Sequence, residues 1–209
     1  MKILIADDHE VVRQGLKQIL AEAFGPLTTG EAGTAAEALE QVDREAWDLV
    51  LLDISMPGRN GMEALADLKR ACPGLPVLVL SMFSEEEYAV RALRAGASGY
   101  LSKQSLGQEL VVAVKKVLDG GRYVSPGQAE LLAANLDPHA PTPPHERLSV
   151  REYEVMKLLA TGRSVKEIAA ELSLGDKTVF TYRARLLEKL GLKSDVEIAR
   201  YALRHRLVE

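Results

Sequence analysis

Five polar side chains that could act together chemically come directly after short apolar runs in the first half of the sequence. They are three carboxylates, a hydroxyl and an amine: Asp7, Asp8, Asp53, Ser81 and Lys103. Carboxylates brought close together repel one another, and a hard divalent cation such as Mg2+ removes that cost. The same cation would neutralise charge on an incoming phosphoryl group, so one carboxylate could accept that group as an aspartyl phosphate. These residues therefore predict a Mg2+-dependent phosphoryl site, with Ser81 and Lys103 contacting phosphoryl oxygens.

The elements that must hold these residues alternate between apolar runs and helical patterns. The runs are Ile3–Ala6, a weaker one near Leu27–Ala32, Leu49–Leu52, Val77–Leu80 and Gly99–Leu101. Helical spacing of apolar residues lies between them, as in Val12, Leu16, Ile19 and Ala23. Strands alternating with helices predict an α/β fold with a five-stranded parallel sheet covered on both faces. Ligands bind such sheets beyond the carboxyl ends of the strands, where the five polar residues fall.

Charge divides the chain into an acidic and a mildly basic part. Residues 1–120 hold 12 Lys and Arg against 18 Asp and Glu, whereas residues 148–209 hold 12 against 9. This difference suggests two kinds of partner. No apolar run approaches the roughly 18 residues of a membrane span, and the apolar start of the chain is too short for a signal peptide. We expect a cytoplasmic protein without a membrane partner, in which the single Cys72 forms no disulfide.

Prolines mark the expected boundary between two domains. Residues 121–147 contain Pro126, Pro138, Pro141, Pro143 and Pro144. Proline favours extended backbone and interrupts helices, so this segment reads as a linker, with a short helix expected at Leu131–Leu136. We expect a domain over residues 1–120, a linker over 121–147, and a second domain over 148–209, with the boundary falling within 137–147.

The second domain is helical by pattern. Three Ser-x-x-Glu sequences predict capping boxes, at Ser149 with Glu152, Ser164 with Glu167, and Ser194 with Glu197. Glycines at 162, 175 and 191 punctuate the helix ends. The helices are expected at about 150–160, 165–172, 176–190 and 195–205.

The second and third of these helices are joined by a short turn that contains Gly175. Such a turn between two helices is typical of a helix-turn-helix, here at about 164–183, whose second helix enters the major groove of DNA. Apolar residues Val179, Leu186 and Leu190 form its inner face. The outer face carries Lys177, Thr181, Ala184, Arg185 and Glu188, with Thr178 at its edge.

Simpler interpretations exist for each of these features taken alone. Asp7 and Asp8 could be a polar loop, Asp53 a helix cap, and the second helix an ordinary amphipathic helix of a bundle. His9 follows two aspartates, but the other histidines, His139, His145 and His205, lack the spacing of metal ligands. We therefore interpret His9 as a loop residue.

The order and spacing of the N-terminal motifs resemble those of CheY-type receivers, the flavodoxin-like (βα)5 domains of response regulators. The matching segments are Ile3–His9, Leu51–Gly58, Leu80–Ser81 and Gly96–Lys103. The resemblance implies that Asp53 is the phosphoacceptor, that Asp8 and the backbone carbonyl of Ser55 bind Mg2+ directly together with Asp53, and that Asp7 acts through water. Ser81 and Tyr100 would occupy the switch positions. Gln104 stands where many receivers have proline, which is expected to alter the loop.

Residues 148–209 resemble the LuxR-type DNA-binding domain that accompanies receivers in the NarL/FixJ class. The matching segments are Leu148–Val155, Lys166–Ala169, Lys177–Val179 and Lys189–Gly191. Family position implies DNA contacts from Lys177, Thr178, Phe180, Thr181 and Ala184, with Arg183 and Arg185 contacting phosphates. Phe180 stands where relatives are often basic, and Ala184 is uncharged, which favours apolar contact with thymine methyl groups.

Together the two resemblances imply a transcriptional response regulator of a two-component system. A sensor histidine kinase would phosphorylate Asp53. Phosphorylation would then release the recognition helix from the receiver and promote a homodimer on double-stranded promoter DNA. The chain would not be an enzyme beyond its own phosphorylation and dephosphorylation. Two alternatives stay open at this point: a phosphatase or phosphotransferase with an aspartyl nucleophile, and a regulator or adaptor that works without phosphorylation.

Overall fold

The chain contains two units, Met1–His139 and Ala140–Glu209, and each is described here by itself. The structure is a computed structural model that describes residues 1–56, 61–82, 85–134, 143–205 and 207–208. Among the described residues, no helix has both the length and the apolar character needed to cross a membrane.

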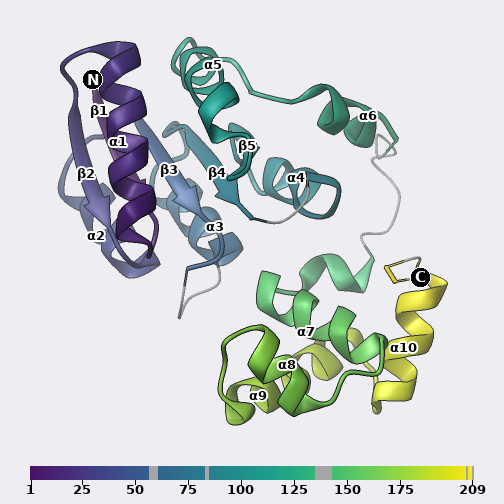
Figure 1. Cartoon of the computed structure of the whole chain (residues 1–209). Helices are drawn as coiled ribbons and strands as arrows, with labels where there is room; N and C mark the ends of the chain where they lie inside the picture. The colour runs from purple at the N-terminus through teal and green to yellow at the C-terminus, as the bar shows by residue number, and fades with distance from the viewer. Residues whose placement is uncertain (57–60, 83–84, 135–142, 206, 209) are drawn as a thin grey trace. The chain divides into compact units, whose positions relative to one another are not determined.

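A five-stranded parallel sheet forms the centre of the N-terminal unit (Figure 1). Its strands are β1 (Lys2–Ala6), β2 (Thr28–Ala32), β3 (Leu49–Asp53), β4 (Val77–Ser81) and β5 (Gly99–Ser102). They are arranged in the order β2-β1-β3-β4-β5, and every neighbouring pair is parallel. The predicted α/β fold is confirmed, including the weakly apolar second strand.

Helices cover both faces of this sheet, as the apolar strands require. Helices α1 (Glu10–Phe24) and α5 (Leu106–Leu118) pack on one face, against side chains such as Ile5, Leu51 and Leu80. Helices α2 (Ala35–Arg44) and α3 (Gly61–Ala71) contact each other on the opposite face, and α4 (Glu85–Arg94) contacts β5 (Figure 1). Strands β3 and β4 are buried along their whole length, and each fully buried leucine or isoleucine side chain contributes about 1.5–3 kcal/mol.

The segment after α5 extends the sheet at the outer edge of β5. Tyr123 forms a parallel bridge with Gly99, and its backbone N–H donates to the carbonyl of Ser98 at 2.9 Å. A glycine is needed at position 99, because an added Cβ would lie 2.9 Å from the carbonyl oxygen of Tyr123. The start of the expected linker, at Tyr123, therefore packs on the sheet of the N-terminal unit.

Helix α6 spans Pro126–Ala134, so the expectation of a short helix beginning at Leu131 was wrong. The residue that starts it is Ser125, whose Oγ accepts from the N–H of Gln128 while Gln128 Oε1 accepts from the N–H of Ser125. This reciprocal cap, with proline at the first helical position, begins the helix five residues earlier. The other end of the expected helix, Leu136, lies outside the described residues.

The C-terminal unit contains a 3-10 turn, η1 (Pro144–Arg147), and the four expected helices. These are α7 (Val150–Ala160), α8 (Val165–Glu171), α9 (Asp176–Leu190) and α10 (Asp195–Arg204). Helix α7 contacts the other three. The core of the unit includes Val155, Met156, Ile168, Leu186 and Ile198, which are fully buried.

Two of the three expected capping boxes form as expected. Ser149 with Glu152 and Ser164 with Glu167 each exchange both hydrogen bonds. At the third, the Ser194 side chain accepts from the N–H of Glu197, but Glu197 Oε2 accepts at 2.7 Å from the N–H of Lys193. The glutamate thus satisfies the amide one residue before the cap, and the expectation of a full box at Ser194 was wrong.

The turn between α8 and α9 differs in one detail from the expectation. Its left-handed residue is Ser173, with φ 54°, while Gly175 is the N-cap of α9 with φ −81°. Gly162 and Gly191 do have positive φ, at 82° and 66°, and end their helices as expected. The helix-turn-helix therefore holds its turn with a serine in a backbone region that favours glycine.

Candidate functional site

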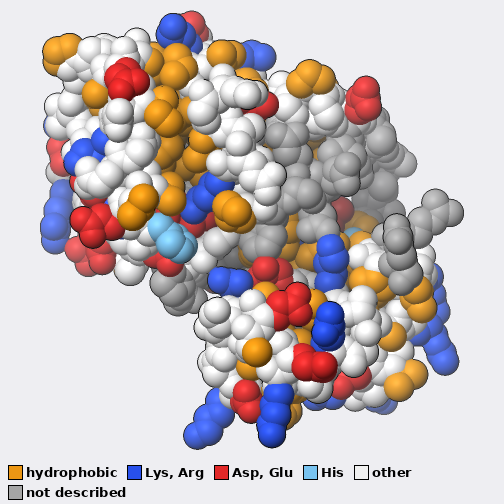
Figure 2. Space-filling model, in the orientation of Figure 1, with side chains coloured by type: hydrophobic (Ala, Val, Ile, Leu, Met, Phe, Trp, Pro, Cys, Tyr) orange, Lys and Arg blue, Asp and Glu red, His pale blue; other side chains and the backbone are white. Residues whose placement is uncertain are grey.

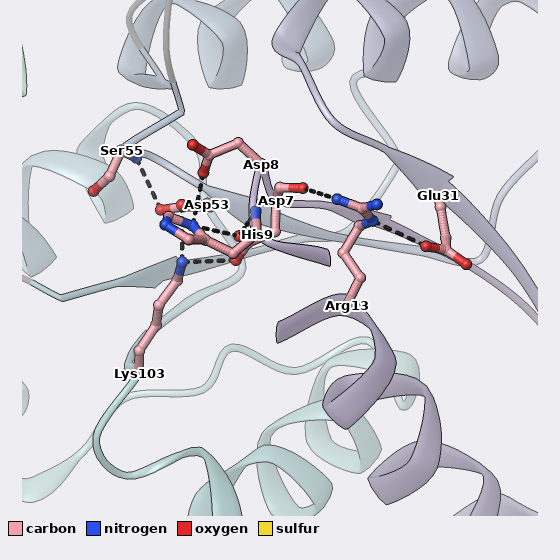
Figure 3. A network of polar contacts seen from close by, with 8 residues as sticks. All are labelled: Asp7, Asp8, His9, Arg13, Glu31, Asp53, Ser55 and Lys103. Carbon is pink, nitrogen blue, oxygen red and sulfur yellow. Dashed lines mark hydrogen bonds and ion pairs between the residues drawn. The ribbon is translucent and has the colours of Figure 1, made fainter. Parts of the chain in front are cut away.

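The three carboxylates singled out in the sequence meet at the carboxyl edge of the sheet (Figure 3). Asp7 follows β1 directly, and Asp53 is the last residue of β3; both are fully buried. Asp8 lies beside them at the rim, where its side chain is partly exposed. The central position of β1 and β3 in the sheet places these residues side by side, since parallel strands end at the same edge.

Lys103 reaches into this edge from the end of β5 and pairs with two of the carboxylates. Its Nζ lies 2.6 Å from Asp7 Oδ2 and 2.8 Å from Asp53 Oδ2 (Figure 3). The side chain is only 8% exposed. Burial alone would lower the pKa of Lys103, but the Asp53 and Asp7 carboxylates outweigh burial and raise the pKa above its ordinary value. Lys103 is therefore held as a cation.

Asp53 is poised between opposing influences. Burial raises the pKa of its carboxyl group above the ordinary value, although the positive charge of Lys103 and a 2.8 Å hydrogen bond from the N–H of Ser55 act in the opposite direction. A carboxylate in so little water is a better nucleophile than a hydrated one, because fewer solvent contacts must be broken before it reacts. Asp53 thus has the environment of a reactive carboxylate.

Ser81 lies on β4, the strand next to Asp53, and Tyr100 lies on β5, one strand further out. Ser81 ends β4, is fully buried, and its carbonyl accepts at 2.7 Å from the N–H of Lys103. Tyr100 lies in β5 opposite Val79 and is also fully buried. The backbone thus joins Ser81 to Lys103, and Tyr100 stands three residues before Lys103 on the same strand and turn.

His9 lies in the loop between β1 and α1, as expected. It is the N-cap of α1, and its ring Nδ1 lies 2.9 Å from Asp8 Oδ1 and 3.3 Å from Asp7 Oδ1. These carboxylates directly precede His9 in the sequence, whereas the presence of Asp53 in the same cluster, from more than forty positions away, is seen only in the structure.

A second network, which the sequence did not reveal, supports the loop between β1 and α1. Arg13 Nη1 donates to the carbonyl of Asp7 at 2.8 Å, and Arg13 Nε pairs with Glu31 at 2.9 Å (Figure 3). Lys17 Nζ also contacts Glu31, at 2.7 Å. Lys17 and then Arg13 lower the pKa of Glu31 below its ordinary value. The signal in the sequence was limited to two cations four residues apart on α1, which is common on exposed helices.

The acidic edge can hold a divalent cation. One oxygen each from Asp7, Asp8 and Asp53 and one ring nitrogen of His9 all lie within 4.8 Å of one another. Carboxylate oxygens are the ligands that hard cations prefer. The donor set therefore fits a metal ion.

The outer face of α9 forms a second candidate site. Lys177, Thr178, Thr181 and Arg185 are exposed and, with Tyr182, line a shallow hollow of about 220 Å3. Phe180 is 55% exposed, although Val179, Leu186 and Leu190 on the inner face are buried as expected. Basic and acidic side chains are interspersed on the visible face of this unit (Figure 2). Contacts with DNA phosphates therefore have to come from a few individual Lys and Arg side chains.

Both units match families of known proteins. The model of the response regulator receiver domain matches residues 3–115, and that of bacterial regulatory proteins of the luxR family matches residues 146–202. Response regulator GacA of Pseudomonas aeruginosa is 38% identical over 210 residues, covering 100% of this chain and 98% of the relative. Response regulator UvrY of Escherichia coli is 36% identical over 208 residues, covering 99% and 95%.

This chain is a response regulator of the NarL/FixJ class. Solved structures of other response regulators agree with this assignment. RcsB of Salmonella typhimurium matches with a TM-score of 0.60 and 27% identity over 96% of this chain and 98% of its own. RcsB bound to promoter rprA in the presence of phosphomimetic BeF3- matches with a TM-score of 0.59 and the same identity and coverage. The response regulator described here is a DNA-binding regulator of transcription.

One expected DNA contact of this response regulator is engaged elsewhere. Arg183 Nε lies 2.7 Å from Asp195 Oδ1, an ion pair that joins α9 to α10, and its side chain is 30% exposed. Ala184 is exposed on the same helix. The structure thus gives Arg183 a role in packing the two helices, which its position near the inner face of α9 already suggested.

Proposed function

We propose that this response regulator accepts a phosphoryl group on Asp53 from a sensor histidine kinase. The observation that carries the proposal is the buried Asp53 carboxylate held 2.8 Å from a cationic lysine at the acidic edge of the sheet. An Asp53 oxygen would form the new bond to phosphorus while the bond from phosphorus to the kinase histidine nitrogen breaks. That nitrogen then recovers a proton.

Mg2+ would be held by Asp8, Asp53 and the backbone carbonyl of Ser55, with Asp7 acting through water. The fit rests on the acidic donor set at the rim of the site. When bound, the ion supplies positive charge that offsets the charge of the phosphoryl group. Asp53 provides the nucleophile, and the hydrogen bond from the N–H of Ser55 orients one of its oxygens.

Lys103, Ser81 and Tyr100 would convert phosphorylation into a change of shape. Lys103 divides its contacts between Asp7 and Asp53, so a phosphoryl group on Asp53 would offer it new oxygens. Movement of Lys103 would pull on the carbonyl of Ser81, to which its backbone is bonded. The Ser81 hydroxyl would then contact the phosphoryl group and Tyr100 would reorient, which is a two-state switch biased by local charge.

Helix α9 would read promoter DNA from the major groove. Lys177, Thr178 and Arg185 would contact phosphates, Thr181 and Ala184 would face the bases, and the exposed ring of Phe180 would contact thymine methyl groups. We propose that the phosphorylated chain binds two half-sites as a homodimer.

The phosphorylation site is tested by labelling with a small phosphodonor. Asp53→Asn should abolish the acyl phosphate, whereas Asp43→Asn, on the exposed part of α2, should keep it. Labelling that survives Asp53→Asn would exclude the proposed site. Size-exclusion chromatography and DNA binding with and without phosphodonor test the switch, and an unchanged species with unchanged binding would contradict it.

We also propose that the chain turns over no substrate beyond its own acyl phosphate. A phosphatase with an aspartyl nucleophile needs a general acid or base beside it. The two carboxylates raise the pKa of Lys103 despite its burial, so this neighbour is unavailable as a base and is a poor proton donor. Incubation with p-nitrophenyl phosphate should give no multiple turnover, and sustained turnover lost in Asp53→Asn would show an enzyme.

A further inference from the structure

His9 places a ring nitrogen among the carboxylates of the proposed metal site. Its backbone N–H donates to Asp7 Oδ1 at 2.9 Å, which fixes the residue over the acidic edge. The ring Nδ1 then lies 2.9 Å from Asp8 Oδ1 and 3.3 Å from Asp7 Oδ1, and Figure 3 shows the ring directed toward these oxygens. The side chain is 66% exposed, so the ring borders the open side of the site.

We propose that His9 Nδ1 is a ligand of the cation held by Asp8 and Asp53, and that this site therefore binds divalent transition metals in preference to Mg2+. The inference rests on the proposed function, because it concerns the same cation site.

The distances match those between ligands that share one ion. Metal–ligand bonds of about 2.1 Å place neighbouring ligands of an octahedral ion about 3 Å apart and opposite ones about 4.2 Å apart. The 2.9 Å separation of Nδ1 from the Asp8 oxygen is that of neighbouring ligands, and the 3.3 Å separation from Asp7 Oδ1 leaves Asp7 beside the site, where it would act through water. The candidate ligand atoms of Asp7, Asp8, His9 and Asp53 are at most 4.8 Å apart. These side chains would therefore need to move only slightly toward one another to surround an ion.

The chemistry of the ring sets the metal preference. A neutral imidazole with its proton on Nε2 presents the Nδ1 lone pair to the ion, and the exposed side of the ring leaves Nε2–H facing water. Mg2+ prefers oxygen ligands and keeps several waters, whereas Mn2+, Co2+ and Ni2+ accept imidazole readily. Affinity should rise from Mn2+ through Co2+ to Ni2+, and His9 should supply most of that rise.

Pulsed electron paramagnetic resonance on the Mn2+-loaded full chain at pH 8 tests the ligand directly. We expect electron spin echo modulation from a coupled imidazole nitrogen, lost in His9→Gln and kept in His205→Gln, which changes an exposed histidine of the C-terminal unit. Bound Mn2+ without nitrogen modulation, or modulation that survives His9→Gln, would overturn the inference and leave the metal site itself intact. Failure of the wild-type chain to bind Mn2+ would overturn both the inference and the proposed cation site.

Calorimetric titration separates the contribution of His9 from that of the carboxylates. His9→Gln should weaken Ni2+ and Co2+ binding at least about tenfold, the scale on which ligand-shell changes act, and should leave Mg2+ affinity within about twofold. Asp8→Asn should weaken the binding of Mg2+, Co2+ and Ni2+ alike. Equal losses for Mg2+ and Ni2+ in His9→Gln would show that the ring orients Asp8 and is not a ligand, and would overturn the proposal.

Discussion

Gln128 donates a 2.9 Å hydrogen bond from its side-chain amide to the backbone carbonyl of Tyr100. Both residues are fully buried, and twenty-eight positions separate them in the sequence. The same amide side chain caps α6 through Ser125. One glutamine thus joins the helix that follows the sheet to the strand that carries the proposed switch tyrosine.

Gln128→Ala should lower the free energy of unfolding of the N-terminal unit by about 1–3 kcal/mol, because it leaves a buried carbonyl without its donor. Gln108→Ala, at an exposed position of α5, is the control and should change stability by less than about 0.5 kcal/mol. Urea unfolding of the full chain measures both. Equal stability of the two variants would show that the bond to Tyr100 contributes nothing.

Lys103→Met should destabilise the metal-free chain by about 3–5 kcal/mol, since it leaves two buried carboxylates without their cation. Lys2→Met breaks an exposed ion pair with Glu45 and should cost about 1 kcal/mol or less. The comparison is made by chemical denaturation with a chelator present. If Lys103→Met unfolds at the same denaturant concentration as the wild type, Asp7 and Asp53 share a proton when the lysine is absent.

The stability of the metal-free chain should depend on Asp53 at acidic pH. Burial raises the folded-state pKa of Asp53 above the value of about 3.9 in an unfolded chain, so the folded chain holds a proton that the unfolded chain releases. Stability should therefore fall as pH rises from about 4 through the folded pKa. Asp53→Asn removes this fall, and its advantage over the wild type should grow across that window and then level off. A constant difference from pH 3.5 to 7 would contradict the raised pKa.

DNA binding should separate the roles of the α9 side chains. Lys177→Ala or Arg185→Ala should each reduce the slope of log affinity against log salt by about one, because each removes one phosphate contact. Phe180→Ala should change base preference and keep the slope. Arg183→Ala serves as a matched control, since its guanidinium is paired with Asp195. Fluorescence anisotropy on a duplex from a mapped binding site measures all four, and a slope that changes only in Arg183→Ala would reverse the assignment.

The sheet and the acidic edge were predictable because each rests on local patterns. Apolar runs mark buried parallel strands, and Asp7, Asp53 and Lys103 fall where those strands end. The carboxyl ends of parallel strands lie along one edge of the sheet, so residues that follow these strands in the sequence lie near one another in space. The helices of the C-terminal unit were predictable for a similar reason, since a Ser-x-x-Glu sequence records a contact within one turn.

What the sequence did not reveal depends on contacts between distant residues or on a choice between equivalent partners. Arg13 pairs with Glu31 only when β2 lies beside β1, and His9 joins a cluster with Asp53 only when β3 does. Gln128 reads as a polar residue of a proline-containing segment until the carbonyl of Tyr100 is placed beside it. Glu197 had two amides within reach, and selection of Lys193 over Ser194 is a matter of side-chain geometry.

The bridge between Tyr123 and Gly99 has a consequence for the behaviour of the sheet outside the intact chain. An open outer strand offers unpaired N–H and C=O groups to any other strand it meets, which invites self-association. Tyr123 occupies the carbonyl of Ser98 just before β5, and Gln128 occupies that of Tyr100 within it, so the chain after α5 covers part of this edge and opposes aggregation. A receiver fragment that ends at Leu118 should therefore self-associate through this edge, whereas one that ends at Ala134 should stay monomeric.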